Sequence, residues 1–175
     1  MSLVERAKKK AREDALAKEK EAQAKIDFQN AIQKALADLS KEVLDKLKEF
    51  DKVKTRFGTL KLEKKRDRIR PHTVLKLVRD TVKEEEVELL LIESRIESGT
   101  RDYADDCRDI PYTEAVVNIF TQDRDRLRSR QDRMYIPANE FGLQSFSTYA
   151  TNWNDRVTKS LEEVADWLAP LFSSK

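Results

Sequence analysis

Glycine, cysteine and histidine are scarce in this chain of 175 residues, and their scarcity excludes several kinds of site. The glycines Gly58, Gly99 and Gly142 stand far apart, so no glycine-rich phosphate loop or dinucleotide-binding fingerprint can form. A single histidine, His72, excludes a multi-histidine zinc or haem site within one chain. A single cysteine, Cys107, excludes an internal disulfide and a thiolate metal cluster. We therefore predict no cofactor and no bound metal, and we assign no catalytic residue.

Long apolar runs are also missing from the sequence. No run approaches the roughly 20 apolar residues that a membrane-spanning helix needs. The N-terminus is basic but lacks the apolar segment of a signal peptide. We expect a cytoplasmic protein without membrane contact, and a single cysteine agrees with a reducing compartment.

Charge is abundant but nearly balanced, since 39% of the residues are charged and the formal net charge is +2. Residues 55–80 hold nine basic and three acidic side chains, whereas residues 81–114 hold four basic and eleven acidic ones. If these two segments form neighbouring strands, their charges pair across the strands. We expect this pairing in preference to a basic surface for a polyanionic partner, which is the alternative.

The densest apolar stretch runs from Val87 to Ile96 and contains four consecutive aliphatic residues, Leu89 to Ile92. A strand with apolar side chains on both faces must be covered on both, which predicts the central strand of a sheet. A helix over 82–98 is the alternative, because Thr81 and Glu84 have the spacing of a capping box. That helix would need burial around its whole circumference, so we favour the strand.

The other elements are predicted from shorter patterns. Segment 69–82 fits a strand slightly better than a helix that begins at Pro71. The segment from Gly99 to Pro111 is rich in aspartate and is predicted as a loop. Apolar residues at helical spacing predict a last helix from Trp153 to Leu171, which Pro170 ends or bends. Further strands are predicted over 55–64, 115–121 and 134–136.

The first fifty residues are predicted to form one long helix with two different halves. Residues 4–25 are strong helix formers with almost no large apolar side chain. An apolar stripe at spacings of three and four follows, made of Phe28, Ile32, Leu36, Leu39, Val43, Leu47 and Phe50. The stripe fits a helix packed on its own domain, an intermolecular coiled coil, or a mixture with its later turns on the core.

Together these elements predict an α+β fold. A long N-terminal helix (residues 1–50) precedes an α+β domain (residues 51–175). That domain holds an antiparallel sheet of four to five short strands, and the amphipathic C-terminal helix packs on the sheet.

Two groups of charged residues suggest binding chemistry. Four arginines alternate with other residues and would share one face of a strand: Arg124, Arg126, Arg128 and Arg130. Guanidinium groups in a row suit phosphate contacts, so nucleic-acid binding that weakens steeply with salt is one hypothesis. The interspersed aspartates favour a neutralised, solvated segment instead.

The second group is acidic and lies after the central strand. Its carboxylates could bind Mg²⁺ or Ca²⁺, and they are Asp102, Asp105, Asp106 and Asp109, with Glu93 inside the strand. The triplet Glu93-Ser94-Arg95 loosely matches the acid-x-basic pattern of metal-dependent nucleases. Arg95 stands where those enzymes need lysine, and the loop lacks the spacing of a calcium-binding loop. A solvated acidic loop is therefore favoured.

The sequence leaves two hypotheses for function. We favour a non-catalytic binding or assembly protein that uses its long helix for docking or for self-association as a homo-oligomer. Phe28, Ile32 and Leu36 are then the residues expected at the interface. The alternative is a protein that binds nucleic acid, or processes it with a metal, through the arginine row.

Overall fold

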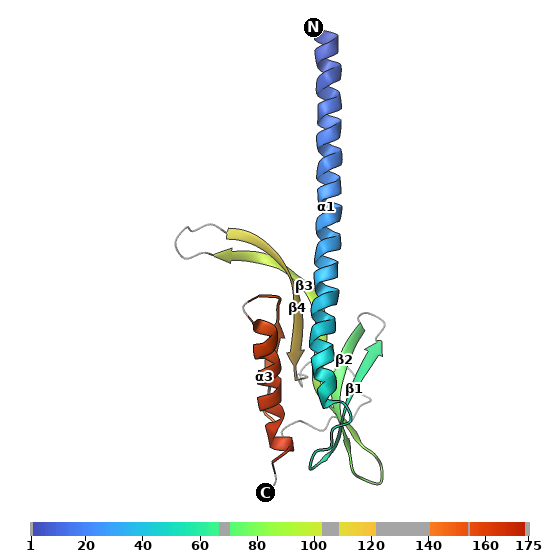
Figure 1. Cartoon of the computed structure of the whole chain (residues 1–175), viewed down its shortest axis with the longest axis vertical. Coiled ribbons are helices and arrows are strands. Elements are labelled where there is room, and N and C mark those ends of the chain that lie inside the picture. The colour runs from blue at the N-terminus through green and yellow to red at the C-terminus, as the bar shows by residue number, and fades with distance from the viewer. Residues whose placement is uncertain (1, 67–70, 103–108, 122–140, 154, 174–175) are drawn as a thin grey trace, which may run out of the picture.

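The computed structural model describes residues 2–66, 71–102, 109–121, 141–153 and 155–173 (Figure 1). Helix α1 is 45 residues long and stands at one end of the sequence, while α3 lies near the other end. A five-stranded sheet lies between them in the chain. In order, the elements are α1 Leu3–Leu47, the 3-10 turn η1 Lys48–Phe50, β1 Gly58–Arg66, β2 Pro71–Arg79, β3 Glu86–Asp102, β4 Asp109–Phe120, β5 Ser147–Ala150, α3 Arg156–Leu168 and the 3-10 turn η3 Ala169–Leu171.

The strands form one antiparallel meander in the order β1-β2-β3-β4-β5. Strand β3 is therefore central, which confirms the prediction for Val87 to Ile96. Segment 69–82 contains strand β2, and the helical alternative for it was wrong. The chain has the predicted α+β fold.

The β3–β4 hairpin is longer than predicted, at 17 and 12 residues for its two strands. The predicted loop from Gly99 to Pro111 was wrong at both ends, because β3 continues to Asp102 and β4 begins at Asp109. Glycine normally weakens a strand, but here the ring of Tyr112 lies directly across from Gly99. A Cβ added to Gly99 would lie 3.0 Å from the Tyr112 ring. The tyrosine thus fills the space that glycine leaves empty.

The C-terminal segment differs from the prediction in two ways. Strand β5 was not predicted, and helix α3 begins at Arg156 rather than at Trp153. Trp153 is exposed instead, and its indole N–H donates to the Glu114 carboxylate at 3.0 Å. The strand predicted over 134–136 lies outside the described residues. Pro170 lies in η3, directly after α3, as its predicted role in ending the helix requires.

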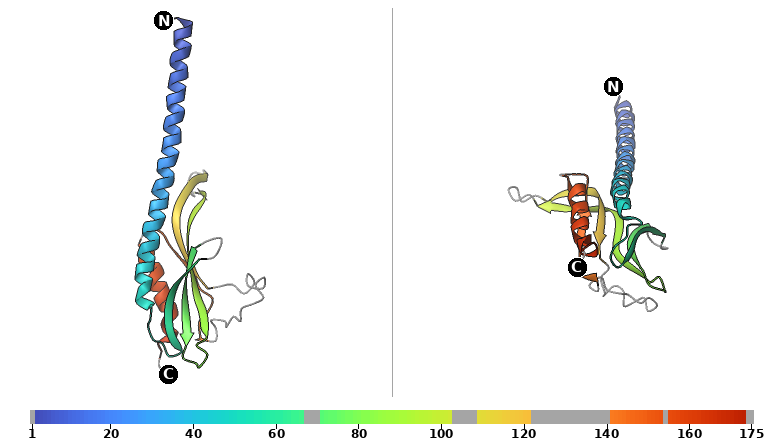
Figure 2. Two further views of the ribbon diagram at one scale, coloured as in Figure 1. Left: turned by 90° about the vertical axis from the view of Figure 1, so that its right-hand side faces the viewer. Right: turned by 60° about the horizontal axis from the view of Figure 1, so that its bottom comes forward.

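Both helices cover the same face of the sheet (Figure 2). Ser40 of α1 accepts a hydrogen bond of 2.8 Å from Ser94 of β3, and Ser160 of α3 lies 3.4 Å from Thr148 of β5. The strand register places Ser94 and Thr148 on one face. The core lies between this face and the two helices. Its fully buried side chains include Leu39, Val43 and Leu47 of α1, Leu60, Leu75, Leu77, Leu90 and Ile119 of the sheet, and Val164 and Leu168 of α3.

Candidate interaction surface

The N-terminal part of α1 rises clear of the folded domain (Figures 1 and 2). Every residue from 3 to 31 is exposed, and we call this segment the arm. At 1.5 Å per residue the arm is about 44 Å long. Only the end of α1, from Leu39 to Leu47, contributes fully buried side chains to the core.

Local interactions, rather than a core, hold the arm helical. The Ser2 hydroxyl accepts from the Glu5 backbone N–H at 3.2 Å, and the Glu5 carboxylate accepts from the Ser2 N–H at 2.9 Å. This capping box satisfies two backbone groups at the helix start. Further along, Lys25 pairs with Glu21 at 3.1 Å. Such pairs contribute only about 0.2–0.5 kcal/mol each, so the arm has little stabilisation of its own.

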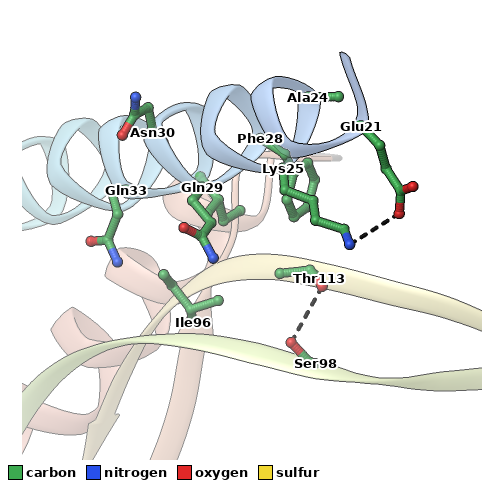
Figure 3. A pocket seen from close by; sticks show the side chains of 11 residues that line it. Glu21, Ala24, Lys25, Phe28, Gln29, Asn30, Gln33, Ile96, Ser98 and Thr113 are labelled. Carbon is green, nitrogen blue, oxygen red and sulfur yellow. Dashed lines mark hydrogen bonds and ion pairs between the residues drawn. The ribbon is translucent and has the colours of Figure 1, made fainter. Parts of the chain in front are cut away.

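A groove of about 760 Å³ opens where the arm passes the β3–β4 hairpin (Figure 3). Gln29 and Gln33 reach from α1 towards the strands, and Ile96 projects from β3 towards the helix (Figure 3). The groove is therefore walled by a helix on one side and a hairpin on the other. Its lining consists of Glu21, Ala24, Lys25, Phe28, Gln29, Asn30, Ile32, Gln33, Ile96, Ser98 and Thr113.

The three residues predicted for self-association lie at and below this groove. Phe28 lines the groove and is 56% exposed, which is unusual for a phenylalanine. Ile32 also lines it and is half-buried against the core, whereas Leu36 is half-buried against the core alone. Sequence reasoning missed Ile96 because its neighbours in the groove come from a distant part of the chain. Contact of these residues with a second copy stays a prediction.

The opposite face of the sheet carries the predicted charge pairing. Lys76 lies between the core residues Leu75 and Leu77, so it points away from the helices. Its buried ammonium pairs with Glu63 of β1 and, at 2.9 Å, with Glu86 of β3. Nearby, Lys65 pairs with Glu88. The pairs Lys76–Glu86 and Lys65–Glu88 therefore join the basic segment to the acidic one across strands, as predicted.

These contacts shift the pKa values of two groups. The hydrogen bond from Lys76, helped by neighbouring lysines, lowers the pKa of the Glu63 carboxyl although desolvation opposes it. Burial by itself would lower the pKa of Lys76. The hydrogen bonds and charges of Glu63 and Glu86 outweigh burial and raise it. Both shifts favour the ionised pair at neutral pH.

We predict that the unfolding free energy of the Glu63→Gln variant falls less between neutral and acid pH than that of the wild type. A depressed carboxyl pKa contributes stability above the unfolded value of about 4.3 and loses it as pH falls through the folded value. The difference in unfolding free energy between wild type and E63Q should shrink below about pH 4. Urea unfolding at several pH values measures it. In a Lys76→Met background the same substitution should give a much weaker pH dependence, because only the neighbouring lysines Lys61 and Lys65 remain, and an undiminished one would contradict the assignment.

The other predicted sites are only partly within the described residues. Arg124, Arg126, Arg128 and Arg130 lie outside them, as do Asp105, Asp106 and Cys107. Glu93 and Arg95 are in β3, where the Arg95 guanidinium pairs with Glu97. Asp102 is the last residue of β3 and pairs in register with Asp109, the first residue of β4. Among the described residues, no three histidine, cysteine or carboxylate side chains are grouped as metal ligands would be.

Known proteins add nothing to this geometry. No family model, curated protein or solved structure matches the chain. Within the described part of the chain, every helix is too short or too polar to cross a bilayer.

Proposed function

We propose that this protein is a non-catalytic assembly protein that binds through the arm of α1. The observation that carries the proposal is the continuous exposure of residues 3–31 in one unbroken helix. In globular proteins most helical stability comes from packing an apolar face, and the arm buries no residue against its own chain. A partner that packs along it would supply that stabilisation.

The exposed apolar side chains of the arm support this proposal. A solvated helix needs no large apolar residue, yet several on the arm are at least half exposed: Leu3, Val4, Leu16, Ile26 and Phe28. Phe28 adds a further argument because it stands beside the groove, where the half-buried Ile32 and Ile96 continue the apolar surface. Apolar side chains with a polar rim are typical of protein contact sites.

We expect removal of residues 1–25 to convert an oligomer into a monomer. The truncation removes most of the arm but no buried residue, so the domain should still fold. Sedimentation equilibrium of both proteins over a wide concentration range measures the effect. Val82→Asp, on the exposed turn between β2 and β3, is the control that should leave the mass unchanged. A full-length chain that is monomeric throughout would contradict the proposal.

A further inference from the structure

We infer that two copies of this chain pair through their arms in antiparallel orientation, so that the first turns of each arm occupy the groove of the other copy. This inference rests on the proposed function and specifies the partner and its geometry.

One face of the arm continues the stripe that packs into the core. Residues at spacings of three and four lie on one side of a helix. Counting back from Phe28 in this way gives a row that we call the arm stripe: Leu3, Ala7, Lys10, Asp14, Ala17, Glu21, Ala24 and Phe28. Glu21, Ala24 and Phe28 also line the groove. The stripe that enters the core below the groove therefore runs out along the arm above it.

A parallel pair in register would place each stripe residue of one chain against the same residue of the second chain. Lys10 would face Lys10, Asp14 would face Asp14 and Glu21 would face Glu21. Like charges forced together at an interface cost several kcal/mol, so a parallel pair is strongly disfavoured.

An antiparallel pair with Ala15 of one arm beside Leu16 of the other removes these conflicts. In this register Lys10 meets Glu21 of the second copy, with opposite charge. Leu3 meets Phe28, the two largest apolar residues of the stripe. Ala7 meets Ala24, and Asp14 meets Ala17, so an alanine in each of these layers permits close approach of the two helices.

The flanking residues select the same register. Beside the stripe, Arg6 then faces Asp27 and Glu13 faces Lys20, and both pairs carry opposite charges. A shift by seven residues in one direction would bring Glu13 of one copy against Glu13 of the other. A shift by seven residues in the other direction would bring Lys20 of one copy against Lys20 of the other. The charges therefore favour one register over its neighbours.

The groove receives the end of the partner arm in this arrangement. Leu3 is 85% exposed in the single chain, and Phe28, its partner in the other copy, lies at the groove. Ile32 and Ile96 continue the apolar surface beneath it. The entering segment 3–12 carries five basic and one acidic residue, and segment 19–28, which it meets along the partner arm, carries three acidic and two basic residues. Charge and shape thus agree on a second arm as the occupant.

Distances between spin labels on the two copies test the orientation in the full-length chain. Leu16→Cys and Ile26→Cys, each in a Cys107→Ser background, place labels on exposed positions off the stripe. In the antiparallel register the labels at position 16 lie side by side. Those at position 26 are separated along the axis by about 32 Å, which is 21 residues at 1.5 Å each. Short distances at both positions would show a parallel pair and overturn the inference while leaving the proposed function intact.

Charge reversal is the second measurement of the same test. Glu21→Lys places two lysines together, and we expect the dimer dissociation constant to rise at least about tenfold, equivalent to about 1.4 kcal/mol. Adding Lys10→Glu should restore it, which a purely structural effect would not do. Glu19→Lys makes the same charge change on the outer side of the arm and is the matched control. Equal weakening by both single variants, failure of the rescue, or a full-length chain that never dimerises would overturn the inference. The last result alone would also overturn the proposed function.

Discussion

Leu90→Asp is expected to abolish folding at room temperature. Leu90 is 1% exposed in the first half of β3 and lies opposite Leu75, which is fully buried on β2. The substitution creates a cavity and places a carboxylate where it has no cation to pair with in the core cluster. Such a change costs more than about 4 kcal/mol, and a domain of this kind is stable by only about 5–15 kcal/mol. Far-UV circular dichroism and urea titration measure the loss.

Val82→Asp is the matched control, because it makes a similar change at an exposed position outside the core. We expect its unfolding free energy to stay within about 0.5 kcal/mol of wild type. If L90D unfolded cooperatively at nearly the wild-type urea concentration, the central position of β3 would be wrong.

Gly58→Ala adds only a methyl group, yet we expect it to lower the unfolding free energy strongly. Gly58 begins β1 with φ at 154°, a conformation that side chains rarely adopt. An added Cβ would lie 2.0 Å from the carbonyl oxygen of Val78 in β2, so one of the two strands would have to move. The Thr55 N–H and hydroxyl both donate to the Gly58 carbonyl, at 2.7 and 2.9 Å, and hold the turn in place. We expect a loss of about 3 kcal/mol or more in unfolding free energy.

Gly142→Ala separates the steric effect from backbone strain. Gly142 also has a positive φ, at 78°, but a Cβ added there meets nothing within 4 Å. Its substitution should cost only the strain of that backbone, about 1 kcal/mol. Urea unfolding of the two variants gives the comparison. Equal losses would show that the contact with Val78 is unimportant.

The central strand could be predicted from sequence because its apolar run is dense, although the two helices cover only one face of the sheet. The sequence of β2 hardly distinguishes a strand from a helix, since Leu75 and Leu77 fit a strand while Val74 and Val78 extend a helical stripe. Its strand conformation depends on pairing with β1 and β3, which no local pattern reveals. Strand β5 has only four residues, and Thr148 is one of its two buried side chains, so it carries little apolar signal.

The candidate surface could be predicted only on its helical side. Phe28 and Ile32 belong to a regular stripe, so their role as an apolar face follows from spacing alone. Ile96 follows Leu90 and Ile92 on the core-facing side of β3, but the local sequence does not reveal that α1 passes this end of the strand. Its position in the groove depends on how the long hairpin passes the arm, which is a property of the assembled fold.

The projecting arm also controls how this protein diffuses. A rod about 44 Å long attached to a small body raises the frictional ratio well above that of a sphere. A single chain of 20.4 kDa therefore elutes early in gel filtration and resembles a larger particle. Tumbling is slowest for rotation of the rod end over end, so amide relaxation rates should vary with bond direction. Mass from light scattering, rather than elution volume, distinguishes an elongated monomer from a pair.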